Sequence, residues 1–369
     1  MPSSLFTPVS LRDLHLRNRI VVSPMGMGLA EQGCATDWYL MHFGNLALSG
    51  AGLVMVGATG VSPQGRSSPH CLGLWNEAQV ESFQPMLSFC RKHGDAKIGI
   101  QLQHSGRKGS VAPPYENLRF LREDEGGWTI VAPSPVAYPK RPVPKELTAA
   151  EIAGIVMDFG NAAKRAHDAG FDLLELHSAH GYLLHQFLSP LTNRRADAYG
   201  GSLRNRMRLP LEAFASVRAA WPERKPLGVR ISATDWIDGG WTLEESIVFA
   251  QALAELGCDY VTASSGGISP DQKITVKPGY QVDFAAAIRR EAKIKTVAVG
   301  LITEARQAEV ILDEGKSDLV ALGRGMIFNP RWAWHAAVEL GEDYFYPPQY
   351  ERSHPRMRSG DFLKPSMRA

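Results

Sequence analysis

Short apolar runs alternate along the chain with longer segments in which apolar residues recur every three or four positions. Eight of the short runs lack the regular polar positions of a half-exposed strand, which is typical of parallel strands covered by helices. These runs lie at residues 20–23, 52–58, 97–103, 172–177, 227–232, 260–264, 296–300 and 318–322. The periodic segments between them are typical of amphipathic helices.

The periodic segments also carry helix boundary signals. Segment 148–169 begins with Thr148 and Glu151, the pattern of a capping box, and Gly170 follows it as a helix-ending residue. The other segments that begin with a capping residue are 202–221, 242–256 and 303–314. Eight strands that alternate with helices predict an α/β fold, a (β/α)8 TIM barrel in a single domain, rather than a doubly wound sheet.

Two long connections interrupt this alternation. Residues 105–147, after the third strand, are rich in proline and aromatic residues and are too long for a simple connection. We expect them to form a capping insertion over the barrel mouth, within a barrel of residues 1–345. Loop 178–201 follows the fourth strand, and the Pro- and Arg-rich tail 346–369 is expected to be loosely held unless a neighbouring subunit binds it.

Composition narrows the function classes. The 369 residues are 44% hydrophobic and 21% charged, which fits a large core and excludes disorder. A net charge of +2 argues against a nucleic-acid surface. The four cysteines form no C-x-x-C pair, so neither a metal site nor a disulfide framework is expected. Without a signal peptide, or an apolar run near the ~18 residues of a membrane span, we expect a cytoplasmic protein with no membrane partner.

Candidate chemistry lies where strands end, because the reactive groups of a TIM barrel come from the C-terminal ends of its strands. Gly300 follows the seventh strand, and Gly323 and Arg324 follow the eighth. Such glycines let backbone N–H groups approach a phosphate closely, and an arginine can bind the phosphate in a bidentate manner, through two hydrogen bonds. The pattern is typical of barrels with phosphorylated cofactors, although tight turns alone would also explain the glycines.

His177 and His180 stand where the fourth strand gives way to its loop, and Tyr182 follows them. Three interpretations are open at this point. A metal site would need a third ligand, and the His-x-His of barrel metallohydrolases is absent near the first strand. Histidines bonded to backbone carbonyls would be structural. A donor pair for a substrate oxygen, with a tyrosine able to give a proton, would be catalytic.

The segments that hold these residues resemble the old yellow enzyme family of FMN-dependent oxidoreductases, in particular the bacterial branch that includes xenobiotic reductases. The resemblance covers nearly the whole chain and is most specific at residues 101–108, 177–190, 193–206 and 323–324. It implies FMN as the cofactor and NAD(P)H as the hydride donor. It also implies a two-step cycle: NAD(P)H reduces the FMN and leaves, and an activated alkene then binds in the same pocket.

The resemblance implies roles position by position. At the cofactor it places Ser23, Pro24, Met25, Gly26, Ala58, Gln101, Arg230, Gly300, Gly323 and Arg324. Among these, Gln101 and Arg230 would face the pyrimidine edge of the flavin, where a cation tunes the cofactor's electron affinity. His177 and His180 would hold the oxygen of the substrate, and Tyr182 would donate a proton to its Cα.

Several positions depart from the family pattern, among them Gly57, where a glutamate is usual, and Tyr39, where a histidine is usual. Gly26 stands where this branch usually has cysteine, and Gly28 where it usually has tyrosine. We therefore expect a wider, more apolar substrate pocket that accepts bulkier molecules, unless Met27 or Leu29 fills the space. Trp334 aligns with an arginine that some members insert into the neighbouring subunit's active site. An aromatic helix packed on its own barrel would also explain Trp334, whereas an interfacial role would fit a homodimer or homotetramer.

These observations favour an NAD(P)H-dependent ene-reductase that acts on a small molecule. The same residues fit a dehydrogenase or oxidase that uses the site in the oxidative direction. A flavin-binding barrel whose altered segment 24–28 has impaired catalysis is the third alternative.

Overall fold

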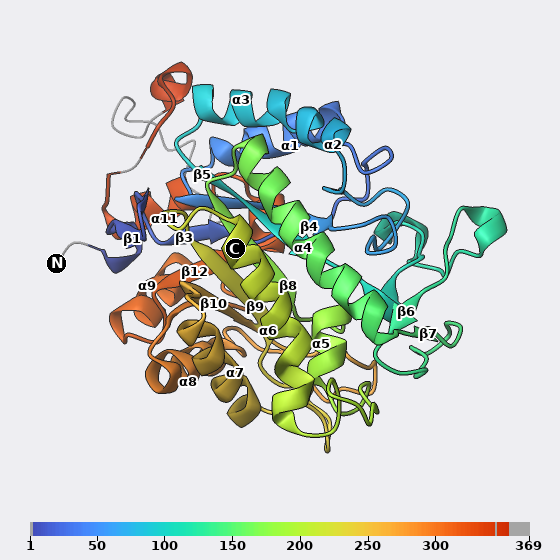
Figure 1. Ribbon diagram of the computed structural model, residues 1–369. Coiled ribbons are helices and arrows are strands. Elements are labelled where there is room, and N and C mark those ends of the chain that lie inside the picture. The colour runs from blue at the N-terminus through green and yellow to red at the C-terminus, as the bar shows by residue number, and fades with distance from the viewer. Residues whose placement is uncertain (1–2, 344, 354–369) are drawn as a thin grey trace.

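The computed structural model describes residues 3–343 and 345–353 and contains a closed barrel of eight parallel strands surrounded by helices (Figure 1). The barrel strands are β3 (Ile20–Val22), β4 (Leu53–Gly60), β5 (Lys97–Gln103), β8 (Leu173–Ser178), β9 (Leu227–Ser232), β10 (Tyr260–Ser264), β11 (Lys295–Val299) and β12 (Leu319–Leu322). Strand β12 pairs with β3 and closes the barrel. The predicted TIM barrel is confirmed, and each predicted strand matches an observed one to within two residues at either end.

Helices lie around the barrel; all but the last two fall between successive barrel strands, and the last two follow β12. They are α1 (Asp37–Ala47), α2 (Glu77–Ser82), α3 (Gln84–His93), α4 (Ala149–Ala169), α5 (Leu183–Leu188), α6 (Leu203–Ala220), α7 (Leu243–Glu255), α8 (Val282–Ala292), α9 (Ala305–Asp313), α10 (Arg324–Phe328) and α11 (Trp332–Leu340). The predicted capping box of α4 is present, because the Glu151 N–H donates to Thr148 Oγ1 at 3.2 Å. Gly170 ends the helix in the left-handed conformation, as expected.

The N-terminal end of the barrel is closed by a hairpin of β1 (Val9–Leu11) and β2 (Leu14–Leu16). Leu11 and Leu16 of this hairpin pack with apolar side chains of the barrel interior, among them Met55 and Tyr260. Gly228 makes room for that packing, since a Cβ there would lie 2.2 Å from the Tyr260 ring. The floor of the barrel is therefore solid, and any site must lie at the opposite end.

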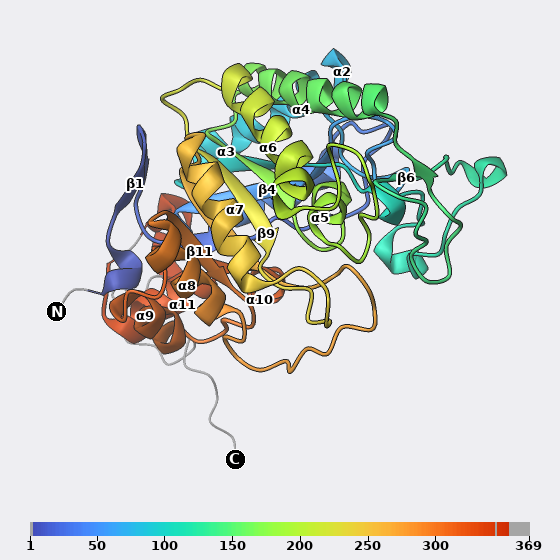
Figure 2. The same cartoon turned by 60° about the horizontal axis from the view of Figure 1, so that its bottom comes forward.

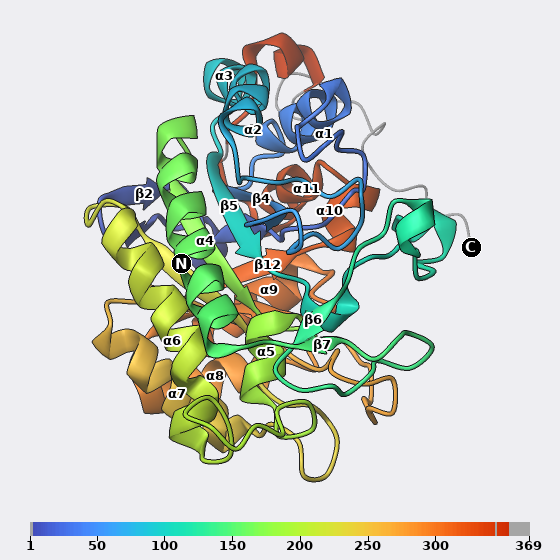
Figure 3. The same ribbon diagram turned by 45° about the vertical axis from the view of Figure 1, so that its right-hand side comes forward.

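The segment between β5 and α4 lies at that opposite end, away from the hairpin (Figures 2 and 3). It contains the short strands β6 (Val131–Ala132) and β7 (Lys145–Glu146), which pair in parallel. It also contains the 3-10 turns Gly106–Lys108, Pro114–Glu116 and Glu123–Glu125. We refer to residues 104–148 as the cap segment.

The end of the described chain packs on α11. The ring of Trp334 lies 4.3 Å from that of Tyr346 and 6.0 Å from that of Tyr350, the latter in the 3-10 turn Pro348–Ser353. The rest of the predicted tail, residues 354–369, lies outside the described residues. Within the described part of the chain, no helix combines the length and apolar character that crossing a bilayer requires.

Candidate active site

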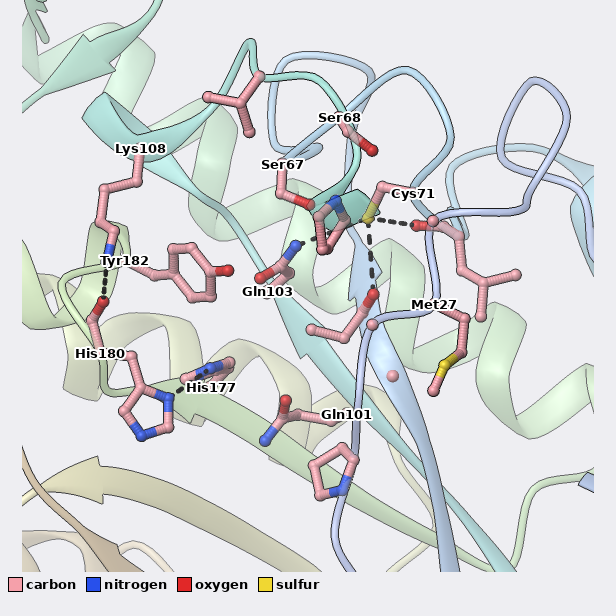
Figure 4. Close-up of a pocket in the computed structure, with 18 of the residues that line it drawn as sticks. Met27, Ser67, Ser68, Cys71, Gln101, Gln103, Lys108, His177, His180 and Tyr182 are labelled. Atoms are coloured by element: carbon pink, nitrogen blue, oxygen red, sulfur yellow. Dashed lines mark hydrogen bonds between the residues drawn. The ribbon is translucent and has the colours of Figure 1, made fainter. Parts of the chain in front are cut away.

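A cavity of about 350 Å³ opens between the C-terminal ends of the barrel strands and the cap segment (Figure 4). A second hollow of about 450 Å³ lies over the ends of β10, β11 and β12. Pro24, His180 and Arg230 line both, so the two spaces adjoin. We call them the β4–β8 cavity and the β10–β12 cavity.

All the residues predicted for the site except Trp334 line one or both of these cavities. The β4–β8 cavity is bordered by Pro24, Gly26, Gly28, Ala58, Gln101, His177, His180, Tyr182 and Arg230. The β10–β12 cavity is bordered by Ser23, Pro24, Met25, His180, Arg230, Gly300, Gly323 and Arg324. The barrel thus brings together residues that lie up to three hundred positions apart in the sequence.

The two histidines form a directed chain of hydrogen bonds. The Ala179 N–H donates to His177 Nδ1 at 3.2 Å, His177 Nε2 lies 3.3 Å from His180 Nδ1, and His180 Nε2 lies 2.7 Å from Ser264 Oγ. Burial, and then the charge of Arg230, hold the pKa of both imidazoles well below the usual range. Both rings are therefore neutral near pH 7, and the network places the single proton of each ring on Nε2.

This arrangement gives the cavity two neutral imidazoles rather than a metal site. His177 Nδ1 accepts from a backbone N–H, and the Nε2–H groups of the two rings are engaged by His180 Nδ1 and Ser264 Oγ, so a ligand oxygen would have to replace or share these bonds. Among the described residues, no group of three or more His, Cys, Asp or Glu side chains is arranged to hold a metal ion.

Tyr182 stands just before α5 and directs its hydroxyl into the β4–β8 cavity (Figure 4). Its ring packs edge-on against that of His177, with centroids 4.9 Å apart. Burial raises the pKa of Tyr182 to about 12, so the hydroxyl keeps its proton across the physiological range. The site therefore holds a protonated hydroxyl beside two neutral imidazoles.

A tight turn holds the tyrosine in this position. His180 and Gly181 are both in the left-handed region, with φ of 56° and 73°. A Cβ at Gly181 would lie 2.2 Å from the Gly267 carbonyl oxygen, so only glycine fits between the turn and the loop after β10. The Gly181 N–H donates to His185 Nδ1 at 2.9 Å and links the turn to α5.

The floor of the β4–β8 cavity is a polar pair over a buried carboxyl group. Gln101 Nε2 donates to Glu175 Oε1 at 2.7 Å, and Thr262 Oγ1 donates to Glu175 Oε2 at 2.6 Å. Burial raises the pKa of Glu175, while the Arg230 guanidinium opposes that rise. The bond to Glu175 fixes the amide of Gln101 and leaves its oxygen as an acceptor toward the cavity.

The residues at these cavities fit the flavin that the resemblance implies. Ser23 Oγ and Arg230 Nε are buried and have no hydrogen-bond partner in the described part of the chain. Burial lowers the pKa of Arg230, and leaving such groups unpaired is costly. A ring system with carbonyl and ring-nitrogen acceptors would satisfy both.

Sequence reasoning missed three residues of this region. Glu175 could have been found, because a charge inside an apolar strand, two positions before His177, must share the same face of β8. Lys108 lies within the matching segment 101–108, but no role was assigned to it. Arg141 has no local signal, since only the folded cap segment brings it to the cavity.

The pocket agrees with the expectation at Gly26 and differs from it at Gly28. A Cβ at Gly26 would meet no atom within 4 Å, so the space there is open, as expected. Beside Gly28, however, a Cβ would lie 3.2 Å from Pro113, and the Tyr115 hydroxyl donates to the Gly28 carbonyl at 2.7 Å. The cap segment therefore fills that side. Lys108 and Arg141 also border the cavity, so charged as well as apolar side chains line it.

Trp334 lines neither cavity of its own chain. A Cβ at Gly50 would lie 2.9 Å from Trp334 Cδ1, so the indole packs on the backbone just before β4. The Arg331 guanidinium lies 4.7 Å from the indole ring. Within one chain, Trp334 is therefore part of the packing of α11.

Comparison with known proteins gives a consistent result. The profile of the NADH:flavin oxidoreductase / NADH oxidase family matches residues 4–342. NADPH dehydrogenase of Geobacillus thermodenitrificans is 45% identical over 355 residues, which cover 95% of this chain and 99% of that protein. NADPH dehydrogenase of Listeria monocytogenes is 45% identical over 354 residues, with the same coverage of both chains.

Among solved structures, morphinone reductase in complex with tetrahydroNAD has a TM-score of 0.77 and 28% identity, covering 94% of this chain and 93% of its own. The match to the family profile and the two relatives extends over nearly the whole barrel, including every candidate site residue. The chain therefore belongs to the NADH:flavin oxidoreductase / NADH oxidase family and is an FMN-dependent NAD(P)H oxidoreductase of the old yellow enzyme type.

Proposed function

We propose that this enzyme is an ene-reductase that reduces the activated C=C bond of α,β-unsaturated carbonyl or nitro compounds. The observation that carries the proposal is the set of three proton-bearing groups in one cavity: the imidazoles of His177 and His180 and the hydroxyl of Tyr182. When bound, FMN supplies the hydride that it has received from NAD(P)H. The protein must supply the remaining elements, which are substrate polarisation, orientation and a proton.

The two imidazoles would bind the substrate's carbonyl or nitro oxygen through their Nε2–H groups, which would exchange their bonds to His180 Nδ1 and Ser264 Oγ for bonds to the substrate. Such donors stabilise the negative charge that develops on that oxygen as hydride adds at Cβ. Tyr182 would then donate its proton to Cα. Because its pKa is about 12, the proton remains on the hydroxyl until the substrate carbon becomes basic.

The cofactor would lie across both cavities. Gln101 and Arg230 would meet the polar edge of its ring, and the backbone of segment 23–26 and Ala58 would line the ring. Gly300, Gly323 and Arg324, which share the β10–β12 cavity, would hold the phosphate. Because a single cavity holds the candidate donors, NAD(P)H and the alkene would occupy it in turn, in a ping-pong cycle.

The purified holoenzyme tests this function. We expect FMN to be bound, NADPH to bleach the flavin absorbance in a stopped-flow instrument, and 2-cyclohexenone to restore it under argon. Bleaching followed by reoxidation with oxygen alone would contradict the proposal and favour an oxidase or dehydrogenase. Bound FMN that NADPH does not bleach would indicate a barrel with impaired catalysis.

We also propose a cytoplasmic homo-oligomer, a dimer or tetramer. Four free cysteines, three of them buried, fit a reducing compartment. Phe328 in α10 is 93% exposed and Ile327 beside it is 44% exposed, an apolar pair that a second subunit would cover. Whether Trp334 then reaches a neighbouring active site would follow from the geometry of that contact.

Gly26→Cys is expected to keep the fold and raise the midpoint potential of the bound flavin. The new side chain enters open space, and a thiol proton beside the ring favours the electron-rich reduced form. A weak hydrogen bond of about 1 kcal/mol corresponds to about 20 mV for a two-electron couple. Gly26→Ala, which adds the same Cβ without sulfur, is the matched control in a dye-equilibration titration. Equal potentials in both variants would exclude a tuning role for this position.

A further inference from the structure

Three cations surround one aromatic ring where the cap segment borders the β4–β8 cavity. The Arg107 Cζ, Lys108 Nζ and Arg141 Cζ atoms lie 5.6, 5.1 and 5.0 Å from the centroid of the Tyr138 ring. No carboxylate in the described part of the chain lies within ion-pair distance of any of the three. A ring face attracts a cation but compensates its charge only partly, and the carboxylate of Asp235 acts on Arg107 only from a distance, so no counter-charge contacts this cluster.

The three cations differ in how far the protein satisfies them. The Arg107 guanidinium donates to the carbonyls of Val136, Ala137 and Ile268, which ties the cap segment to the loop after β10. Arg107 is therefore structural.

The side chains of Lys108 and Arg141 donate fewer hydrogen bonds to the protein than that of Arg107, and both line the cavity. The Lys108 ammonium donates to the carbonyls of His180 and Gly267, at 2.8 and 3.1 Å, and keeps its third proton. The Arg141 guanidinium donates no hydrogen bond to any described residue, and its Nη1 is buried without a partner.

The cavity itself provides no negative charge. Among the described residues that line it, none is Asp or Glu, whereas three are cationic: Lys108, Arg141 and Arg230. Burial, and then the charges of Arg141 and Arg107, lower the pKa of Lys108 to about 7. An anion at this place would remove that electrostatic cost, and it would lie beside the ring of Tyr182, 5.7 Å from Lys108 Nζ.

We propose that Lys108 and Arg141 bind an oxyanion, a carboxylate or phosphate, of the molecule that occupies the β4–β8 cavity. The inference rests on the proposed function and deepens it. The oxyanion belongs either to the alkene, which would then be an activated alkene with an added carboxylate, or to the dinucleotide of NADPH. Arg141 supplies the planar pair of donors that such groups prefer, and Lys108 supplies a second charge.

Binding to the holoenzyme by calorimetry tests this without turnover. The probes are 4-oxopentanoate, its neutral methyl ester, and inorganic phosphate. We expect 4-oxopentanoate or phosphate to bind at least about tenfold more weakly to Arg141→Gln, as for loss of a charged hydrogen bond. The methyl ester should bind equally to both enzymes. Arg122→Gln, on the exposed side of the cap segment, is the matched control and should change nothing.

Stopped-flow kinetics then identify the source of the oxyanion. Faster reoxidation by 4-oxopent-2-enoate than by its methyl ester, with the advantage lost in Arg141→Gln, supports the substrate carboxylate. If NADPH bleaches the flavin more slowly in Arg141→Gln, while reoxidation by both alkenes keeps its wild-type rate, the oxyanion is a phosphate of the dinucleotide. Equal anion binding and kinetics in wild type and variant would overturn the proposal. Failure of all alkenes to reoxidise the wild-type enzyme would instead overturn the ene-reductase function and leave the binding test valid.

The pH dependence of binding is a second readout. The groups packed around Lys108 are Arg107, Arg141, Tyr138, Tyr182 and the His180 backbone. As pH rises through about 7, Lys108 loses its charge, so the affinity for 4-oxopentanoate should fall between pH 6 and pH 9. Lys108→Met should bind more weakly and lose this dependence. A wild-type affinity that does not change with pH would contradict the role of Lys108.

Discussion

Tyr182→Phe is expected to slow reoxidation of the reduced enzyme by 2-cyclohexenone by at least about 100-fold, the usual contribution of a positioned general acid. Bleaching by NADPH should be unchanged, because that half-reaction transfers hydride and needs no proton at this position. The substitution removes one oxygen and keeps the ring that packs on His177. Stopped-flow measurement of the two half-reactions separates these effects.

Tyr39→Phe is the matched control for this prediction. Tyr39 lines the same cavity and also loses only a hydroxyl, but its oxygen accepts from the Leu29 N–H at 3.3 Å and is part of the wall. The Tyr39→Phe substitution should leave the rate of reoxidation nearly unchanged. If Tyr182→Phe slowed both half-reactions equally, the hydroxyl would be positioning the cofactor instead of donating a proton.

The pH profile gives a further check. Burial raises the pKa of Tyr182 to about 12, so its proton is present throughout the range from pH 6 to pH 9. The pKa values of the two histidines are held well below the usual range by burial, so both rings are neutral near pH 7. Any titration of reoxidation by a neutral enone near pH 7 should therefore come from Lys108, whose pKa is about 7, and should be absent in Lys108→Met.

The barrel and most of its site follow from the sequence because topology constrains them. Once the strands are found, every C-terminal end lies on the same face, so Gln101, His177 and Arg230 must converge however far apart they lie. Apolar runs and capping residues are local signals. The apolar runs were sufficient to predict the strands, and the capping residues were sufficient to predict the start of α4.

The parts that could not be predicted depend on contacts between distant segments. Cys71 is an ordinary thiol by its spacing, yet the fold places it in the wall of the β4–β8 cavity, 3.6 Å from Gln103 Nε2. The position of Arg141 depends on the bonds of Arg107 to the loop after β10. The filling beside Gly28 likewise depends on how Pro113 returns over the strand ends. A long irregular segment has no periodicity from which such contacts could be read.

The second large effect is expected on substitution of Asp235, whose hydrogen bonds stabilise the turn that positions Tyr182. Asp235 is fully buried and accepts from Ser189 Oγ at 2.6 Å and from the Trp241 N–H at 2.8 Å. Its other oxygen lies 2.9 Å from His185 Nε2, and the opposite nitrogen of His185 accepts from Gly181. This network links the loops after β8 and β9 to the turn that positions Tyr182.

Asp235→Ala is therefore expected to lower the free energy of unfolding by about 3–5 kcal/mol, because two buried donors, the Ser189 hydroxyl and the Trp241 N–H, lose a charged acceptor. Urea unfolding of the holoenzyme, followed by circular dichroism, measures this. Asp124→Ala is the control, since that carboxylate is exposed in the cap segment and pairs only with exposed Arg122. Little change in the urea midpoint for Asp235→Ala would mean that the turn does not depend on this network.

The decrease in the free energy of unfolding caused by Asp235→Ala should also depend on pH, in a direction that the pKa of Asp235 sets. Burial raises the pKa of Asp235, but His185, Ser189 and the Trp241 N–H lower it more, so the net value lies below the usual range. A carboxyl group whose pKa is depressed by folding stabilises the protein above its unfolded pKa of about 3.9. That stabilisation disappears as pH falls through the folded value. The difference between wild type and Asp235→Ala should therefore be full at pH 7 and smaller near pH 3, and a constant difference would show that the carboxylate charge contributes nothing.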